Sequence, residues 1–176
     1  MTNHDELVEN GYLFVPMEIT RESYEDFIKD ALEISLNDTI KTVHVYINSY
    51  GGNLDACKQM VDVLYYLKRI GKKVVTICSG IAASAGFHIF VIGDERKITK
   101  YSILMCHRYS GGGYLKHPDL IAARKADDWE FETQINMVAD ALKWTKTKVK
   151  KELFTPEDKW FLPKEAIDME IATEIL

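Results

Sequence analysis

Ser84 is the best-placed nucleophile in this chain of 176 residues. It lies in the run Ala82-Ala83-Ser84-Ala85-Gly86, whose other members are all small. Small neighbours let a substrate carbonyl approach the serine hydroxyl closely, and the N–H of the following residue can face the oxyanion that forms. The same run also suits close helix packing, which needs no chemistry. Ser79, which precedes Gly80, is a second candidate that we interpret as a turn residue.

A serine hydroxyl is a weak nucleophile and needs a general base, usually a histidine that a carboxylate orients. Among the five histidines, His107 is favoured because it ends the apolar run 103–106 and precedes a segment rich in glycine. A strand end that opens into a glycine loop exposes the imidazole. We expect His88, four residues after Ser84, to be directed into packing. The remaining three lie in a polar tail, inside a strand and at a helix entrance: His4, His44 and His117.

The order of these residues along the chain separates hydrolase classes. No histidine follows His117, so the Ser–acid–His order of the α/β-hydrolases is disfavoured. An order of Ser84, His107 and a later acid remains open, and spacing does not choose that acid. Asp158 has a structural alternative, because residues 155–158 resemble a helix start with a capping box. The aspartates after His107 are Asp119, Asp127, Asp128, Asp140, Asp158 and Asp168.

Alternating apolar runs and amphipathic stretches must position these side chains. Such alternation predicts an α/β fold with parallel strands and right-handed crossovers. Two glycine turns, Gly51-Gly52 and 80–86, each lead from a strand into a helix and can present backbone N–H groups to a developing negative charge. The expected strands are 12–15, 43–47, 74–78, 96–98 and 103–106; the expected helices are 21–36 (capped by Thr20), 54–69, 118–146 and two short pieces near Pro156 and Pro163.

The window from Val74 to Gly93 contains no Asp, Glu, Lys or Arg over twenty residues, which is the length of a membrane span. Its middle, however, holds Ser79, Gly80 and Ser84, and its first part is a β-branched run. We therefore expect a buried strand, a tight turn and a short buried helix, and no membrane association.

The composition is that of an ordinary globular protein, with 47% hydrophobic and 28% charged residues, so intrinsic disorder is excluded. A net charge of −5 disfavours a nucleic-acid binder, and the lysine-rich segment 143–151 is interpreted as a solvated helix end. Residues 1–40 hold ten acidic and two basic residues, and therefore carry −8, which leaves +3 for the rest.

Cysteine usage and the amino terminus bear on the compartment. Cys57, Cys78 and Cys106 form no CxxC motif, which is typical of buried free thiols in a reducing environment. The first residues show no signal peptide, so we expect a cytoplasmic protein. We also expect one domain over 1–176, with residues 1–11 as a short acidic tail, and no cofactor or metal.

Four motifs follow one another along the chain. They are Tyr46-Ile47-Asn48-Ser49-Tyr50-Gly51-Gly52, Gly80-Ile81-Ala82-Ala83-Ser84-Ala85-Gly86, Met105-Cys106-His107 with Gly111-Gly112, and Asp158 through Glu165-Ala166. Their order and spacing resemble those of the Clp protease proteolytic subunit (ClpP) family, over residues 12–176. The resemblance implies a crotonase-like spiral of ββα units with a long handle helix at 118–146.

Carried over position by position, the resemblance implies a serine endopeptidase. Ser84 would be the nucleophile, His107 the general base and Asp158 the residue that orients the base. The backbone N–H groups of Gly52 and Ala85 would form the oxyanion hole. Family members assemble as two stacked heptameric rings around a chamber that receives protein or peptide substrates, and the handle helix would join the rings.

The chain departs from the family pattern at three places. Tyr50 replaces the usual proline and Ala85 the usual methionine, and neither change removes a backbone donor. The segment before Tyr12 is short, whereas the family carries an extended segment there that engages a hexameric AAA+ unfoldase. An AAA+ ATPase partner is therefore less expected for this chain. Its short acidic N-terminus is more similar to that of stand-alone or phage-type ClpP-like proteases.

Two other functions remain open from the sequence. A crotonase-type enzyme acting on an acyl-CoA thioester would use the same glycine turns without a serine nucleophile. A non-catalytic ring subunit that pairs with an active paralogue is the second. Relatives with a Ser/Lys dyad carry a membrane anchor, and none is evident in the sequence.

Overall fold

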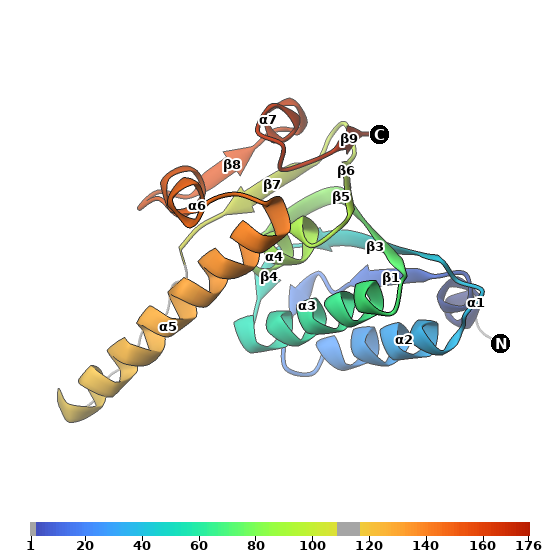
Figure 1. The fold of residues 1–176 in the computed structure, drawn as a ribbon, viewed down its shortest axis with the longest axis horizontal. Helices are drawn as coiled ribbons and strands as arrows, with labels where there is room; N and C mark the ends of the chain where they lie inside the picture. Colours follow the sequence, from blue (N-terminus) through green and yellow to red (C-terminus); the bar gives the residue numbers. More distant parts are fainter. Residues whose placement is uncertain (1–2, 109–116) are drawn as a thin grey trace. The chain divides into compact units, whose positions relative to one another are not determined.

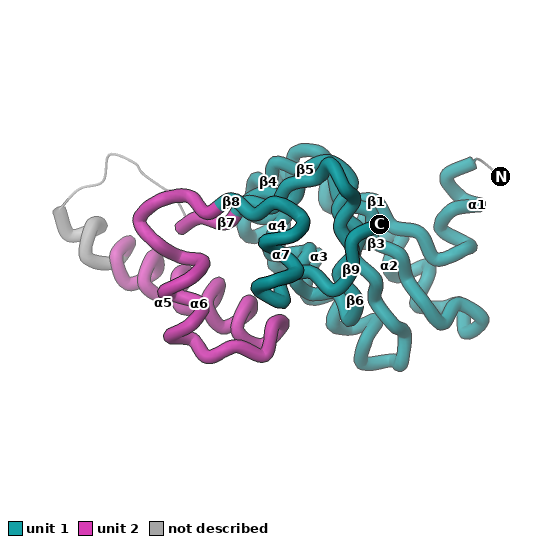
Figure 2. Tube along the Cα trace, turned by 90° about the horizontal axis from the view of Figure 1, so that it is seen from above, with its two compact units in different colours: residues 1–105, 160–176 teal, residues 106–159 magenta. Residues whose placement is uncertain are grey.

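The structure, a computed structural model, describes residues 3–108 and 117–176, with the backbone alone for residues 117–122. The chain divides into two compact units, of which unit 1 comprises Met1–Met105 and Trp160–Leu176 and unit 2 comprises Cys106–Lys159 (Figure 2). Seven helices and nine strands form within the described residues. The α/β class expected from the sequence is confirmed.

The main sheet of unit 1 is parallel, as the buried apolar runs predict. Its strand order is β1-β3-β5-β6-β9 (Figure 1). Strand β7 pairs with the last residues of β5 and also with β8, and a separate parallel pair joins β2 to β4. The strands are β1 (Tyr12–Val15), β2 (Glu18–Ile19), β3 (Thr42–Ser49), β4 (Gly51–Gly52), β5 (Lys73–Ala83), β6 (Glu95–Ile98), β7 (Ile103–Cys106), β8 (Lys159–Phe161) and β9 (Glu174–Ile175).

Helices α2 and α3 lie side by side along one face of this sheet (Figure 1). Helix α3 begins where Asn53 accepts a hydrogen bond from the Ala56 N–H at 2.9 Å, which caps its first turn. Its buried side chains recur at helical spacing, with Met60, Leu64 and Leu67 fully buried. The helices of unit 1 are α1 (Asn3–Glu9), α2 (Tyr24–Leu36), α3 (Leu54–Arg69), α4 (Ala85–Val91) and α7 (Pro163–Asp168).

Strand β5 is longer than the sequence predicts, and the prediction of a tight turn at Ser79–Gly80 is wrong. The strand continues through Gly80, which adopts φ +114° and donates its N–H to Ser102 Oγ at 2.7 Å. A Cβ at Gly80 would collide with the Asn48 side chain, so glycine is required there. Ser79 is thus a strand residue. The uncharged window 74–93 covers most of this strand and all of helix α4. Every residue of α4 is buried.

Three other element boundaries differ from expectation. Helix α2 begins at Tyr24, with Ser23 and not Thr20 at its N-cap position, and Thr20 and Ser23 exchange hydrogen bonds in the turn before it. In the described part of the chain no helix starts near Pro156, and β8 lies there instead. Residues 3–9 form α1, with Val8 buried.

Unit 2 is built on α5 (His117–Leu142) and α6 (Lys146–Glu152). The long helix ends before residue 146 because Lys143 adopts φ +57°, and Thr145 then caps α6 by accepting the Lys148 N–H. The Phe131 and Phe154 rings meet edge to face at 5.9 Å. Among the described residues, the fully buried side chains of this unit are Cys106, Ile135, Val138, Val149, Leu153 and Phe154.

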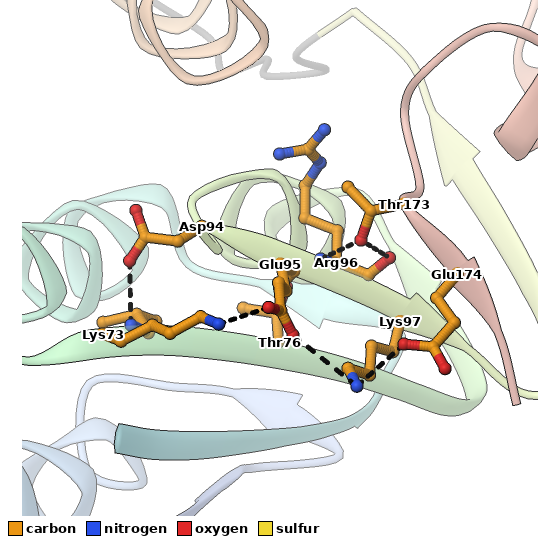
Figure 3. Close-up of polar contacts among 9 residues, drawn as sticks. Lys73, Thr76, Asp94, Glu95, Arg96, Lys97, Thr173 and Glu174 are labelled. Carbon is orange, nitrogen blue, oxygen red and sulfur yellow. Dashed lines mark hydrogen bonds and ion pairs between the residues drawn. The ribbon is translucent and has the colours of Figure 1, made fainter. Parts of the chain in front are cut away.

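Polar contacts fasten the end of the chain to strand β6 (Figure 3). Lys97 pairs with Glu174 at 2.8 Å, and the Arg96 backbone N–H donates to Thr173 Oγ1 at 2.9 Å. Glu95 also pairs with Lys73 on the neighbouring strand β5. The edge between β5, β6 and β9 therefore combines strand pairing with ion pairs.

Among the residues that the structure describes, no helix has the length and apolar character needed to cross a membrane.

Candidate active site

Ser84 occupies the turn between strand β5 and helix α4, with φ 54° and ψ −119°. These angles belong to the first central residue of a type II′ turn, a position that favours glycine. Holding a serine there costs about 1–3 kcal/mol. Ser84 is partly accessible, whereas Ala83 and Ala85 on either side are buried. A strained serine in a strand-to-helix turn is an arrangement that exposes a nucleophilic hydroxyl.

The peptide groups on both sides of Ser84 are held by hydrogen bonds. Its N–H donates to the carbonyl oxygen of Met105 on β7 at 3.0 Å. Its carbonyl oxygen accepts the N–H groups of Phe87 at 3.0 Å and His88 at 3.3 Å. Since these bonds come from a neighbouring strand and from the following helix, they fix the unusual backbone conformation.

The turn Gly51–Gly52 lies directly against Ser84. Gly51 adopts φ +92°, and a Cβ there would lie 2.6 Å from the Ala83 oxygen, 2.7 Å from the Ala85 nitrogen and 2.8 Å from Ser84 Cβ. Because no side chain fits in this space, glycine is required at position 51, directly beside the Ala85 nitrogen. The structure thus brings together the two turns in which the oxyanion donors were expected.

Ser49 supports the glycine turn. Its side chain is fully buried, and its Oγ accepts the Gly51 N–H at 3.2 Å and donates to the Met17 carbonyl oxygen at 3.2 Å. Gly52 adopts φ +138°, and a Cβ there would overlap the Ile19 backbone on strand β2. The position of Gly52 therefore depends on its pairing with β2.

His107 and Asp158 face each other within unit 2. The distance from His107 Nδ1 to Asp158 Oδ1 is 3.7 Å, and the side chains are 24% and 55% exposed. This separation exceeds that of a hydrogen bond but permits an ion pair when the imidazole is protonated. Asp158 lies in the loop before β8, so its alternative assignment as a helix-capping residue is wrong.

The other aspartates that follow His107 have different surroundings. Asp168 accepts a hydrogen bond from Lys164 at 2.6 Å. Asp127, Asp128 and Asp140 are exposed positions of helix α5. None of these four is paired with a histidine in the contacts of the described residues, whereas Asp158 is.

Two further histidines, His4 and His44, contact other parts of unit 1. His4 pairs with Asp30 at 3.0 Å. His44, on strand β3, stacks on Tyr12 with ring centroids 5.3 Å apart. Burial lowers the pKa of His44, and the positive charge of Lys97 lowers it further. His44 therefore stays neutral to more acidic pH than an ordinary imidazole.

The three cysteines are poor nucleophiles. Cys57, Cys78 and Cys106 are free and buried. Burial raises the pKa of Cys78 to about 12 and also raises that of Cys106. Since the thiolate is the reactive form of cysteine, burial and a raised pKa disfavour reaction of Cys78 and Cys106 near neutral pH.

Sequence reasoning missed one contact of the nucleophile turn. His88 was assigned to packing, and it is indeed buried, yet its Nδ1 lies 3.0 Å from the Ser84 carbonyl oxygen. The spacing of four residues on one helix was the signal that could have indicated this contact. Gly111 and Gly112, which form part of the third motif, lie outside the described residues.

The sequence was compared with those of known protein families. The Clp protease family matches it over residues 1–176. The chain belongs to the Clp protease family. It is 31% identical over 124 residues to an ATP-dependent Clp protease proteolytic subunit 3 of Synechococcus sp. (strain CC9605). It is equally similar to a proteolytic subunit 2 of Prochlorococcus marinus (strain MIT 9312). Each match covers 69% of this chain and 56% of the relative, so the chain aligns with little more than half the length of these Clp protease subunits.

Proposed function

We propose that this chain is a serine endopeptidase in which Ser84, His107 and Asp158 act as a catalytic triad. The observation that carries the proposal is the backbone of Ser84, a strained non-glycine residue between β5 and α4. Such strain persists in a protein only where surrounding contacts maintain it, and it concentrates at functional sites. A serine that served packing alone would gain nothing from this conformation.

The triad assigns a role to each side chain. Ser84 Oγ attacks the carbonyl carbon of a peptide bond while His107 accepts its proton. The same proton passes to the leaving amine as the C–N bond breaks. Water, deprotonated by His107, then attacks the acyl carbon, and this second proton returns to Ser84 Oγ as the acyl–oxygen bond breaks. Asp158 faces His107 Nδ1 and would stabilise the imidazolium formed in both steps.

Two backbone N–H groups would stabilise the tetrahedral oxyanion. These are the N–H groups of Gly52 and Ala85, which belong to the turns that meet at Gly51. Donors fixed before the reaction need no reorganisation when charge develops, and removing one such donor typically costs 10²–10³ in turnover. The tight fit around Gly51 supports this role because it leaves little freedom to either turn.

His107 is tied to the nucleophile turn through the chain itself. Met105, whose carbonyl oxygen accepts the Ser84 N–H, precedes His107 by two residues. The short covalent link between Met105 and His107 favours cooperation between this histidine and Ser84.

We further propose that the active form is a homo-oligomer of stacked heptameric rings, whose chamber admits protein or peptide substrates. The family supports this assembly. Helix α5, with 26 residues, is long enough to serve as the element through which the rings meet.

Replacement of Ser84 by alanine tests the mechanism. We expect Ser84→Ala to lower peptide turnover by a factor on the order of 10⁶, because a triad acts as a unit. It should also abolish covalent labelling by a fluorophosphonate. The assay uses a fluorogenic peptide and the purified full chain, without ATP.

Ser79→Ala is the matched control, since Ser79 is an exposed serine on the same strand. It should retain both turnover and labelling. Persistent labelling of Ser84→Ala would remove Ser84 from the mechanism. Turnover of an acyl-CoA thioester by both variants, without peptide cleavage by the wild type, would instead favour a crotonase-type enzyme.

A further inference from the structure

His88 contacts the nucleophile turn through a side chain that the proposed reaction does not use. It is 2% exposed on helix α4, and its Nδ1 lies 3.0 Å from the carbonyl oxygen of Ser84. A carbonyl oxygen can only accept a hydrogen bond, so Nδ1 must carry a proton and donate it. The contact therefore fixes the protonation of this ring nitrogen.

The accepting oxygen belongs to the peptide group that also carries the Ala85 N–H. A trans peptide is planar, and its C=O and N–H point in opposite directions. The structure contains no cis peptide bond among the described residues. A donor that holds the Ser84 carbonyl thus also sets the direction of the Ala85 N–H.

The two sides of this peptide group have different neighbours. On the carbonyl side lie the His88 ring and the backbone N–H groups of Phe87 and His88. On the nitrogen side lies the space beside Gly51, where a Cβ would come within 2.7 Å of the Ala85 nitrogen. Rotation of the peptide would break the His88 contact and turn the Ala85 N–H away from this space.

We propose that His88 is a positioning residue that holds the Ser84–Ala85 peptide in the orientation required for oxyanion stabilisation. The inference rests on the proposed function, because it assigns His88 a role in the reaction of Ser84. It acts through the backbone and does not touch the substrate.

The surroundings of His88 argue against packing as its whole role. Its neighbours Phe87, Ile89 and Phe90 are fully buried apolar residues, and the Phe87 ring meets the imidazole edge to face at 6.3 Å. Burying a polar ring among such side chains costs free energy that an apolar ring would avoid. The hydrogen bond to Ser84 offsets that cost.

Two substitutions separate positioning from packing. His88→Phe keeps an aromatic ring but removes the donor, whereas His88→Asn places an amide N–H close to the position of Nδ1. We expect H88F to lower kcat roughly tenfold to a hundredfold with KM unchanged, which is less than the loss of an oxyanion donor itself. We expect H88N to recover kcat to within about threefold of the wild type, since it restores the hydrogen bond.

Phe90→Leu serves as the matched control, because it changes a buried ring on the same helix and leaves the contacts of Ser84 and His88 in place. It should lower the melting temperature without changing kcat. Melting curves of all variants identify any loss of folded protein, and kcat is expressed per fluorophosphonate-labelled site.

A wild-type kcat in H88F would overturn the proposal. So would an H88N variant as slow as H88F, or an equal loss of kcat in F90L, since both outcomes would assign the effect to packing. A failure of the proposed function would be seen in a different measurement. In that case the fluorophosphonate would not label the wild type, or it would still label Ser84→Ala.

Discussion

At the scale of single residues, backbone geometry and burial distinguish Ser84 from the other potential nucleophiles. Ser84 is held at φ 54° and is partly accessible. Cys57 lies close by, with its Sγ donating to the Ala85 carbonyl oxygen at 3.3 Å, but it is buried. Cys78 is two residues before Gly80 on β5, and burial raises the pKa of its thiol to about 12. A serine hydroxyl is thus accessible where the nearby thiols are not.

The thiols should be unreactive in the folded protein. We expect no reaction of the native chain with Ellman's reagent at pH 8 and three equivalents after unfolding in guanidinium, because all three thiols are buried. Raising the pH from 8 to 10 should hardly change the rate at which Cys78 reacts with this reagent. Its pKa of about 12 lies above that range, so its thiol stays protonated in the folded state.

Ser79→Cys provides the comparison, since position 79 is exposed on the same strand. In the native state, one thiol of this variant should react with Ellman's reagent, and the reaction should become faster as the pH rises. A native wild type that reacts at the same rate would show that the buried cysteines open readily to solvent.

At the scale of elements, strand and helix order could be read from the sequence, while the continuation of β5 through Ser79 and Gly80 could not. Periodicity predicted β1, β6, β7 and α3 within a residue or two. It placed a turn at Ser79–Gly80 because both residue types interrupt apolar runs. The strand continues there because Ser102 and Asn48, distant in sequence, satisfy and shape the backbone around Gly80. Such contacts leave no local pattern.

The residues of the candidate site also divide into those that the sequence predicted and those that only the fold could identify. Ser84 could be singled out from its small neighbours alone, and His107 from its place at a strand end. The choice of Asp158 needed either a family resemblance or the fold, because six aspartates follow His107. The contact of His88 with Ser84 was hidden because a buried histidine usually indicates only a satisfied side chain.

The attachment of the carboxyl-terminal elements α7 and β9 depends on Arg96 of β6. Its Nε donates to the Ile171 oxygen at 2.7 Å and its two Nη groups to the Gly93 and Glu170 oxygens, both at 3.1 Å. Burial lowers the pKa of this guanidinium, and Asp94 partly offsets that effect. Three backbone carbonyls thus share one fork-shaped donor.

We expect Arg96→Ala to lower the free energy of unfolding by about 2–4 kcal/mol, because it leaves these carbonyls without their charged donor. Arg96→Lys should recover only part of the loss, since an ammonium cannot reproduce the fork. Guanidinium denaturation measures both variants, and limited proteolysis should release the carboxyl-terminal segment first from Arg96→Ala.

Lys97→Ala is the control on the next residue. Lys97 pairs with Glu174 and Glu95, whose carboxylates raise its pKa, but these contacts are exposed (Figure 3). Exposed ion pairs contribute little to stability. A loss as large as that of Arg96→Ala would contradict the assignment of Arg96 as the main attachment.

At the scale of the whole molecule, the proposed ring assembly needs a surface that a single chain leaves open. The first half of α5 offers one, since its described side chains from residues 124 to 129 are exposed and include Trp129 at 62%. An exposed tryptophan on a long helix is typical of residues that become buried between subunits.

Replacement of Trp129 by glutamate should therefore weaken the association between rings. We expect sedimentation to show fourteen chains for the wild type and seven for Trp129→Glu, because a charge replaces apolar contact area at the helix. Tyr101→Glu is the control, as Tyr101 is 89% exposed on unit 1. Equal masses for wild type and Trp129→Glu would exclude this part of α5 from the ring contact.

The hydrogen bond between Ser84 and Met105 sets an order of events during synthesis. The nascent chain presents Ser84 twenty-one residues before Met105, and β5 cannot complete its pairing with β7 until that later strand has left the ribosome. Until then, one of the bonds that maintain the nucleophile turn is missing. The backbone conformation of Ser84 is therefore completed only after Met105 has been synthesised.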